Sequence, residues 1–148
     1  MLVVADASPV NVLVRIQHIE VLPRLFGRIV IPPAVEREML HPSTPKEVST
    51  WLASRPAWLE VRVPAHVDVL LPVDPGEQEA ISLARELKAD LLLVDDRKAR
   101  RAAQGQGLAI AGTLSVLERA AQQGILHLGE ALTRIRATDF SISDRLLR

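Results

Sequence analysis

The sequence contains no cysteine, which excludes a disulfide framework and a thiolate zinc site. Its apolar runs fall far short of the roughly 18–20 residues that a membrane-spanning helix needs, and no signal peptide is recognisable. The chain also lacks a net charge, because its 18 basic and 18 acidic residues cancel. Overall charge therefore does not favour nucleic-acid binding. These absences predict a cytoplasmic protein without membrane contact.

What the sequence does contain is a regular alternation of short apolar runs and amphipathic segments. This alternation predicts a three-layer α/β domain with a central, mainly parallel sheet and right-handed crossovers. The chain length of 148 residues fits one domain, 1–148, in which 129–148 form a helical C-terminal extension. Strands are expected at 2–6, 28–31, 59–63 (an edge strand), 91–94 and 108–111, and helices at 9–16, 33–40, 46–54, 75–88, 97–104 and 113–123, with a short connecting element at 23–27.

Two of the expected strands end in aspartate. The apolar run 91–94 leads into Asp95 and Asp96, and the first strand leads into Asp6. Ligands of parallel sheets bind just beyond the carboxyl ends of the strands. These aspartates therefore fall where a functional site is expected.

Helical geometry ranks the acids of two expected helices. In helix 75–88 the apolar face is centred about 55° from Glu77 and about 105° from Glu79. In helix 33–40 the apolar face is centred about 50° from Glu38 and about 110° from Glu36. Glu77 and Glu38 are the better candidates for a site between helix and sheet.

Each candidate acid also has a purely structural interpretation. Asp74 and Glu77 stand at the two acidic positions of a capping box. Asp95 or Asp96 fits the N-cap of helix 97–104, and Glu38 fits a surface residue paired with a neighbouring base. Together, however, the acids come from four separate elements that a parallel fold brings to one end of the sheet.

Several unpaired carboxylates in one cleft repel one another, which raises their pKa values unless a cation neutralises them. An all-oxygen ligand set favours Mg²⁺ or Mn²⁺ over zinc. One or two such ions activate water and stabilise the leaving oxygen during phosphodiester cleavage. The acids therefore predict a carboxylate-lined site for Mg²⁺ or Mn²⁺.

Five segments carry a resemblance to a known family through their order and spacing. They are 3–9, 31–38, 76–81, 93–100 and 110–114. In these segments the chain resembles the PIN-domain nucleases, and in particular the compact prokaryotic members similar to VapC-type toxins. The resemblance covers residues 2–126. It implies a metal-dependent endoribonuclease with a quartet of acids at the C-terminal end of a parallel sheet.

Carried over residue by residue, the resemblance makes Asp6 the family's first aspartate and leaves the fourth acid open. Many relatives have Thr or Ser two residues before that acid, whereas here Val94 precedes Asp96 and Asp95 intervenes. Ser8 matches a small hydroxyl residue that orients Asp6 or a water, although it also fits a helix N-cap. The implied catalytic and metal-binding set is Asp6, Glu38, Glu77, Asp95 and Asp96, with Glu79 as the alternative to Glu77.

A basic cluster follows the second acidic strand end. Arg97, Arg100 and Arg101 share a helix and are candidates for contacts with RNA phosphates, which position a substrate without reading its sequence. The structural alternative is an exposed helix solvated by its own charges. The resemblance further implies RNA as substrate, a cognate antitoxin protein as partner and a homodimer.

The leading hypothesis is therefore an endoribonuclease that hydrolyses RNA phosphodiester bonds, as the toxin of a toxin–antitoxin pair. The rival is a catalytically weak PIN-like module that binds RNA or a partner protein through 129–148. A phosphoaspartyl phosphatase is disfavoured, because Ser8 stands where a second aspartate would be expected.

Overall fold

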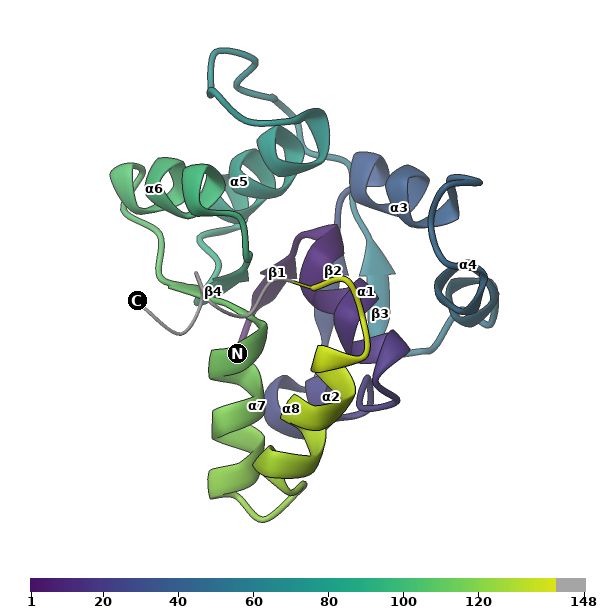
Figure 1. Ribbon diagram of the computed structural model, residues 1–148. Coiled ribbons are helices and arrows are strands. Elements are labelled where there is room, and N and C mark those ends of the chain that lie inside the picture. Colours follow the sequence, from purple (N-terminus) through teal and green to yellow (C-terminus); the bar gives the residue numbers. More distant parts are fainter. Residues whose placement is uncertain (141–148) are drawn as a thin grey trace.

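The computed structural model describes residues 1–140 (Figure 1). Five strands form one sheet in the order β3-β2-β1-β4-β5, and every neighbouring pair is parallel. The predicted α/β fold with a parallel sheet is confirmed, and so is the edge position of the third strand. The strands are β1 (Val3–Ala5), β2 (Ile29–Ile31), β3 (Leu59–Val61), β4 (Leu91–Leu93) and β5 (Ile110–Ala111).

Helices connect the strands and flank the sheet. They are α1 (Ala7–Arg15), α2 (Val21–Phe26), α3 (Pro33–Leu40), α4 (Lys46–Ala53), α5 (Pro75–Leu87), α6 (Arg97–Gly105), α7 (Thr113–Gln122) and α8 (Leu128–Arg136). Helix α5 packs across β1 and β4, and α6 packs against β5, while α7 packs on α1, α2 and α8. Across residues 1–140, every helix is too short or too polar to cross a membrane.

The core is built on the three central strands. All residues of β1, β2 and β4 are buried, as expected for apolar strands of a parallel sheet that is covered on both faces. The edge strand β3 is only half-buried and alternates apolar and charged side chains.

Two local predictions differ from the structure. Helix α1 begins at Ala7 with Asp6 in the N-cap position, so Ser8 lies inside the first turn and is not the N-cap. Residues 23–26 of the expected connecting element belong to a helix, α2, in which Pro23 is the third residue. Proline is tolerated there because the first N–H groups of a helix have no intrahelical partner. The final residues of the expected extension, 141–148, lie outside the described residues.

The centre of the sheet brings two acidic strand ends together. Val3 pairs with Leu91 and Ala5 with Leu93, and the amide of Asp6 extends this ladder by donating to the carbonyl oxygen of Leu93 at 2.9 Å. Starting from β1, the chain first adds β2 and β3 on one side and then β4 and β5 on the other side. Ligands of open α/β sheets bind at such a reversal of strand order.

Candidate functional site

Carboxylates from several elements gather beyond the carboxyl ends of β1 and β4. Asp6 directly follows β1 and is 6% exposed, and Glu77 lies in the first turn of α5 and is 7% exposed. Glu38, near the end of α3, Asp74, at the start of α5, and Asp96, after β4, are exposed. We call these five side chains the acidic cluster.

Burial and mutual repulsion raise the pKa values of three of these acids. The pKa of Asp6 is well above its usual value, chiefly because of burial and then because of Glu77, with the amide of Ala7 opposing the shift. Burial also raises the pKa of Glu77 to about 7, with additional repulsion from Asp74, Asp96 and Glu38. The pKa of Glu38 is raised by partial burial and by Asp74. The cluster therefore favours protons or cations at neutral pH.

The first turn of α5 holds its two acids in a capping box. The Glu77 amide donates to Asp74 Oδ1 at 2.8 Å, and the Asp74 amide donates to Glu77 Oε1 at 3.1 Å. The structural interpretation of this pair is confirmed. It does not account for the raised pKa of Glu77, which comes from burial and neighbouring acids.

Gly76 lets the carboxylate of Glu38 approach the start of α5. A Cβ atom at this position would lie 3.0 Å from Glu38 Oε1 and 3.5 Å from Asp74 Oδ1. The missing side chain therefore leaves room for two acids that face each other across α3 and α5.

Asp95 has a different environment from its neighbour Asp96. It is 1% exposed and accepts three hydrogen bonds: from the Thr113 amide to Oδ1 at 2.7 Å, from the Thr113 hydroxyl to Oδ2 at 2.7 Å, and from the Ser8 hydroxyl to Oδ2 at 3.1 Å. Asp95 thus joins the end of β4 to the first turns of α1 and α7. Ser8 bonds to this carboxylate and not to Asp6.

Asp96 points outward and caps α6. Its Oδ2 accepts a hydrogen bond from the Ala99 amide at 3.0 Å, and its charge contributes to the raised pKa of Glu77. Of the two neighbouring aspartates, Asp96 is therefore the one that belongs electrostatically to the acidic cluster.

The other two helical glutamates have partners of their own. Glu79 accepts a hydrogen bond from the Ala34 amide at 2.9 Å and pairs with Arg37 at 3.7 Å, while Glu36 pairs with Arg55 at 2.5 Å. The ranking of Glu77 above Glu79 by burial agrees with the structure. Glu38, in contrast, is more exposed than Glu36, because it faces a hollow beyond the sheet and not the core.

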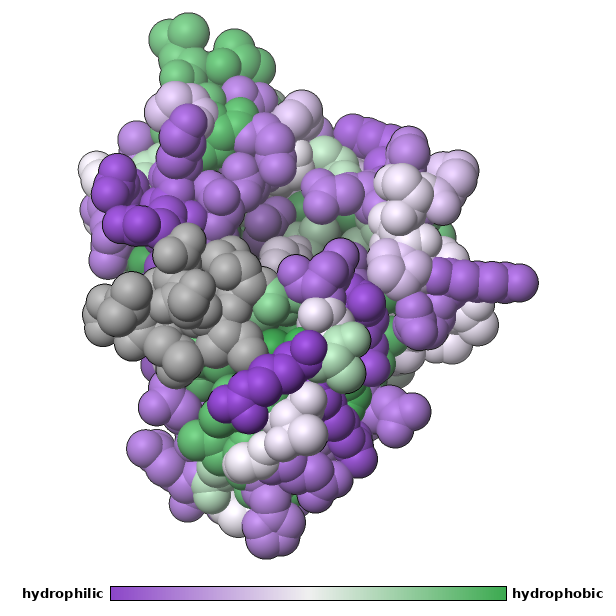
Figure 2. Space-filling model, viewed as in Figure 1, coloured by the Kyte–Doolittle hydropathy of each residue, from purple (hydrophilic) through white to green (hydrophobic). Residues whose placement is uncertain are grey.

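The three candidate RNA-binding arginines lie on α6. Arg97 and Arg101 are exposed and Arg100 is half-buried, and α6 belongs to a strongly hydrophilic part of the surface (Figure 2). Ala99 and Ala103 face the core. Among the described residues, the linings of the two hollows beside Glu38 include no residue of α6.

Two open hollows meet at Glu38. One, of about 520 Å³, lies between α3 and the start of α5, and the other, of about 420 Å³, runs along α1. The hollows share Glu38, Ser43 and Thr44. Sequence reasoning assigned no individual role to several other polar side chains that line them: Asn11, Arg15, Arg37, His41 and Asp139.

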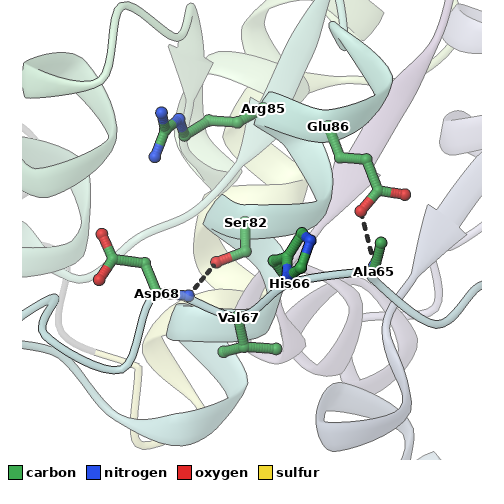
Figure 3. Close-up of a pocket in the computed structure, with 7 residues that line it drawn as sticks. All are labelled: Ala65, His66, Val67, Asp68, Ser82, Arg85 and Glu86. Atoms are coloured by element: carbon green, nitrogen blue, oxygen red, sulfur yellow. Dashed lines mark hydrogen bonds between the residues drawn. The ribbon is translucent and has the colours of Figure 1, made fainter.

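A third hollow, of about 510 Å³, lies against α5, away from the acidic cluster (Figure 3). The loop that lines it is fastened to the helix: the Ala65 amide donates to Glu86 Oε1 at 2.6 Å, and the Asp68 amide donates to Ser82 Oγ at 2.9 Å. The loop also carries two exposed apolar side chains, Val69 and Leu70. Ser82 and Glu86, two of the polar side chains that line the hollow, are thus used to hold the loop.

The donor set of the acidic cluster fits a hard divalent cation. All five side chains offer oxygen, the ligand atom that Mg²⁺ and Mn²⁺ prefer, and their repulsion is relieved by positive charge. Within residues 1–140, no three acidic or histidine side chains yet stand in an arrangement that could hold an ion. Binding would therefore require side chains such as the exposed Glu38 to rotate inward.

Comparisons with known proteins agree with the fold. A PilT N-terminus domain protein from the hyperthermophilic archaeon Sulfolobus solfataricus P2 has a similar structure, with a TM-score of 0.59 and 20% sequence identity over 86% of this chain and 97% of that chain. No curated protein sequence matches the chain. The family model DUF3368, described as a PIN domain, matches residues 2–148. The chain therefore belongs to the PIN-domain family.

Proposed function

We propose that this protein is a metal-dependent endoribonuclease that hydrolyses RNA phosphodiester bonds. The observation that carries the proposal is the acidic cluster, in which burial and repulsion raise the pKa of Asp6, Glu38 and Glu77. A protein gains nothing in stability from such repulsion, so a site for a cation explains it better than a structural role does. PIN domains are typically nucleases and usually depend on metal.

Asp6, Glu38, Glu77 and Asp96 are the residues that would hold Mg²⁺ or Mn²⁺. Glu77 would bind through Oε2, because Oε1 already accepts the Asp74 amide. Asp95 would not bind the ion directly, since both of its oxygens accept hydrogen bonds from Ser8 and Thr113. It would instead hold the elements next to the site in place. When bound, the ion supplies an activated water and neutralises charge on the phosphate.

The side chains of the site would position the ion and the RNA and would transfer protons. The capping box fixes Glu77 at the start of α5, and the open surface beside Glu38 would admit a phosphodiester to the cluster. A carboxylate whose pKa is near 7, as at Glu77, is suited to accept or release a proton at neutral pH. The roles of toxin, of antitoxin binding and of homodimer formation belong to the same proposal and rest on the family resemblance alone.

The test is calorimetric titration of Mn²⁺ into wild type and Asp6→Asn, with cleavage of fluorescent single-stranded RNA assayed on the same samples. We expect Asp6→Asn to lose metal uptake and to cleave on the order of 100-fold more slowly, because a ligand is lost. Glu118→Gln, an exposed acid on α7, is the matched control and should behave as wild type. A wild-type protein that takes up no Mn²⁺ and leaves RNA intact would favour the catalytically weak binding module.

A further inference from the structure

The hollow along α1 presents one face of that helix to the acidic cluster. Ser8, Asn11 and Arg15 line it at intervals of three and four residues, so they share one side of α1. Glu38 stands where the hollow meets the second one. Because seven residues separate Ser8 from Arg15, the hollow leads about 10 Å along the helix away from the strand end.

The far end of the hollow carries an arginine that is already paired. Arg15 donates to Asp139 Oδ1 at 2.5 Å, and the side chains are 22% and 88% exposed respectively. Asp139 follows α8, on the segment that passes α1 in Figure 1. The pairing lowers the pKa of Asp139. An exposed ion pair of this kind contributes little to stability, so its place in the hollow calls for another explanation.

An unsatisfied acceptor lies between this pair and the cluster. Asn11 Oδ1 is buried and has no hydrogen-bond partner among the described residues. A buried acceptor without a partner costs free energy unless a ligand supplies a donor. RNA offers such donors in the 2′-hydroxyl groups and in the edges of unpaired bases.

We propose that the hollow along α1 holds single-stranded RNA on one side of the cleaved phosphodiester, with Arg15 as a positioning residue that binds a backbone phosphate and Asp139 as its internal competitor. This inference rests on the proposed nuclease function. A volume of about 420 Å³ is in the range of small-ligand pockets and suits one strand, not a duplex. The planar guanidinium fork of arginine binds carboxylate and phosphate in the same way, so the two compete.

Because Asp139 competes with phosphate for Arg15, the two residues affect RNA affinity in opposite directions. Removal of the Arg15 charge takes away the phosphate contact and weakens RNA binding. Removal of the Asp139 charge frees Arg15 and strengthens RNA binding. If the pair served only the fold, both substitutions would lower stability slightly. They would not change RNA affinity in opposite directions.

The experiment measures binding of a fluorescein-labelled, random-sequence 12-nucleotide RNA by anisotropy, on the full chain, with EDTA to prevent cleavage. We expect Arg15→Gln to weaken binding roughly tenfold, as for a lost charge-assisted hydrogen bond. The slope of log affinity against log salt should fall in magnitude by about 0.7, the value for one phosphate of a single strand. Asp139→Asn should bind more tightly than wild type.

A matched pair elsewhere in the molecule provides the control. Arg28 and Glu60 form an exposed ion pair at 3.4 Å, and Arg28 precedes β2, at the opposite end of the sheet from the cluster. Arg28→Gln and Glu60→Gln should leave affinity and salt slope unchanged, and thermal unfolding should show that all four variants are folded.

Outcomes for the two proposals separate clearly. Changes of the same sign in Arg15→Gln and Asp139→Asn, effects equal to the control pair, or no RNA binding by wild type would each overturn the role of the hollow. If the opposite signs are found but wild type with Mn²⁺ leaves RNA intact, the hollow stands as an RNA site and the nuclease proposal fails.

Discussion

Asp6 and Asp95 occupy neighbouring places in the fold but opposite environments. Each follows a central strand, the two strands are neighbours, and both side chains are buried, at 6% and 1% exposure. Asp95 accepts three hydrogen bonds from Thr113 and Ser8. Asp6 has Glu77 and Glu38 nearby, so burial and repulsion raise its pKa.

The difference separates a carboxylate whose hydrogen bonds join three elements of the fold from one that lies among like charges and that we propose as a cation ligand. A buried charge with enough donors is compatible with stability, whereas a buried charge among like charges must be protonated or neutralised. Burial alone therefore does not identify a functional acid. The chemistry of the nearest side chains does.

The largest expected effect is the response of the acidic cluster to pH. The folded pKa of Asp6, Glu38 and Glu77 is higher than the unfolded one, so the unfolded chain binds fewer protons at these groups. For Glu77 this difference spans about pH 4.5 to 7. In EDTA, the free energy of unfolding should therefore fall as pH rises through this window, by up to about 3 kcal/mol from Glu77 alone.

Urea unfolding at pH 5, 6, 7 and 8 measures this trend. Glu77→Gln should flatten it, and saturating Mn²⁺ should remove it, because the ion replaces the protons. Stability in EDTA that rises over this range would contradict the assigned electrostatics.

The next effect concerns the carboxylate that has donors. Asp95→Ala leaves the buried Thr113 amide without its acceptor, so we expect a loss of about 2–3 kcal/mol in the free energy of unfolding at pH 7. Asp6→Asn removes repulsion and should cost less than about 1 kcal/mol or stabilise the protein. Urea unfolding measures both values. Equal losses of unfolding free energy in the two variants would contradict the proposed difference between Asp95 and Asp6.

A smaller effect distinguishes Asp96 from Asp95. Asp96→Ala removes the N-cap of α6, which costs about 1 kcal/mol, but it should reduce Mn²⁺ affinity on the order of 10-fold or more if Asp96 is a ligand. Calorimetry and unfolding on the same samples report both quantities. Unchanged Mn²⁺ affinity would remove Asp96 from the proposed ligand set.

The smallest effect on stability is expected at Gly76. Gly76→Ala places a Cβ 3.0 Å from Glu38 Oε1 and so pushes that carboxylate away, while alanine favours the helix by up to about 1 kcal/mol. We expect equal or higher thermal stability together with slower RNA cleavage, since small misplacements near the reacting groups are costly. Gly129→Ala on α8, with open space around its Cβ position, is the control.

Much of the fold followed from local patterns. The apolar runs, the prolines at helix starts and the capping box of α5 placed the elements and the parallel sheet, and helical spacing ranked Glu77 above Glu79. Where the prediction was wrong, local rules were ambiguous. Ser8 and Pro23 both lie in first turns, where serine and proline fit several positions.

The candidate site was harder to predict than the fold, because its contacts join distant segments. Asp95 and Asp96 are indistinguishable in sequence, and only the approach of Thr113 and Ser8 separates them. Glu38 was expected near the buried face of its helix, but its side chain is exposed and lines a hollow. The acids of this site remain predictions until metal binding is measured.

The sequence by itself determined the α/β alternation, the strand ends that carry acid and the all-oxygen chemistry of the candidate site, because these depend on periodicity and residue type. Only the tertiary structure decided which carboxylates receive donors and which face one another, and that Arg15 meets Asp139 across 124 residues of chain. Hydrogen bonds, burial and repulsion act over a few ångströms in space, and the spacing along a chain does not report those distances.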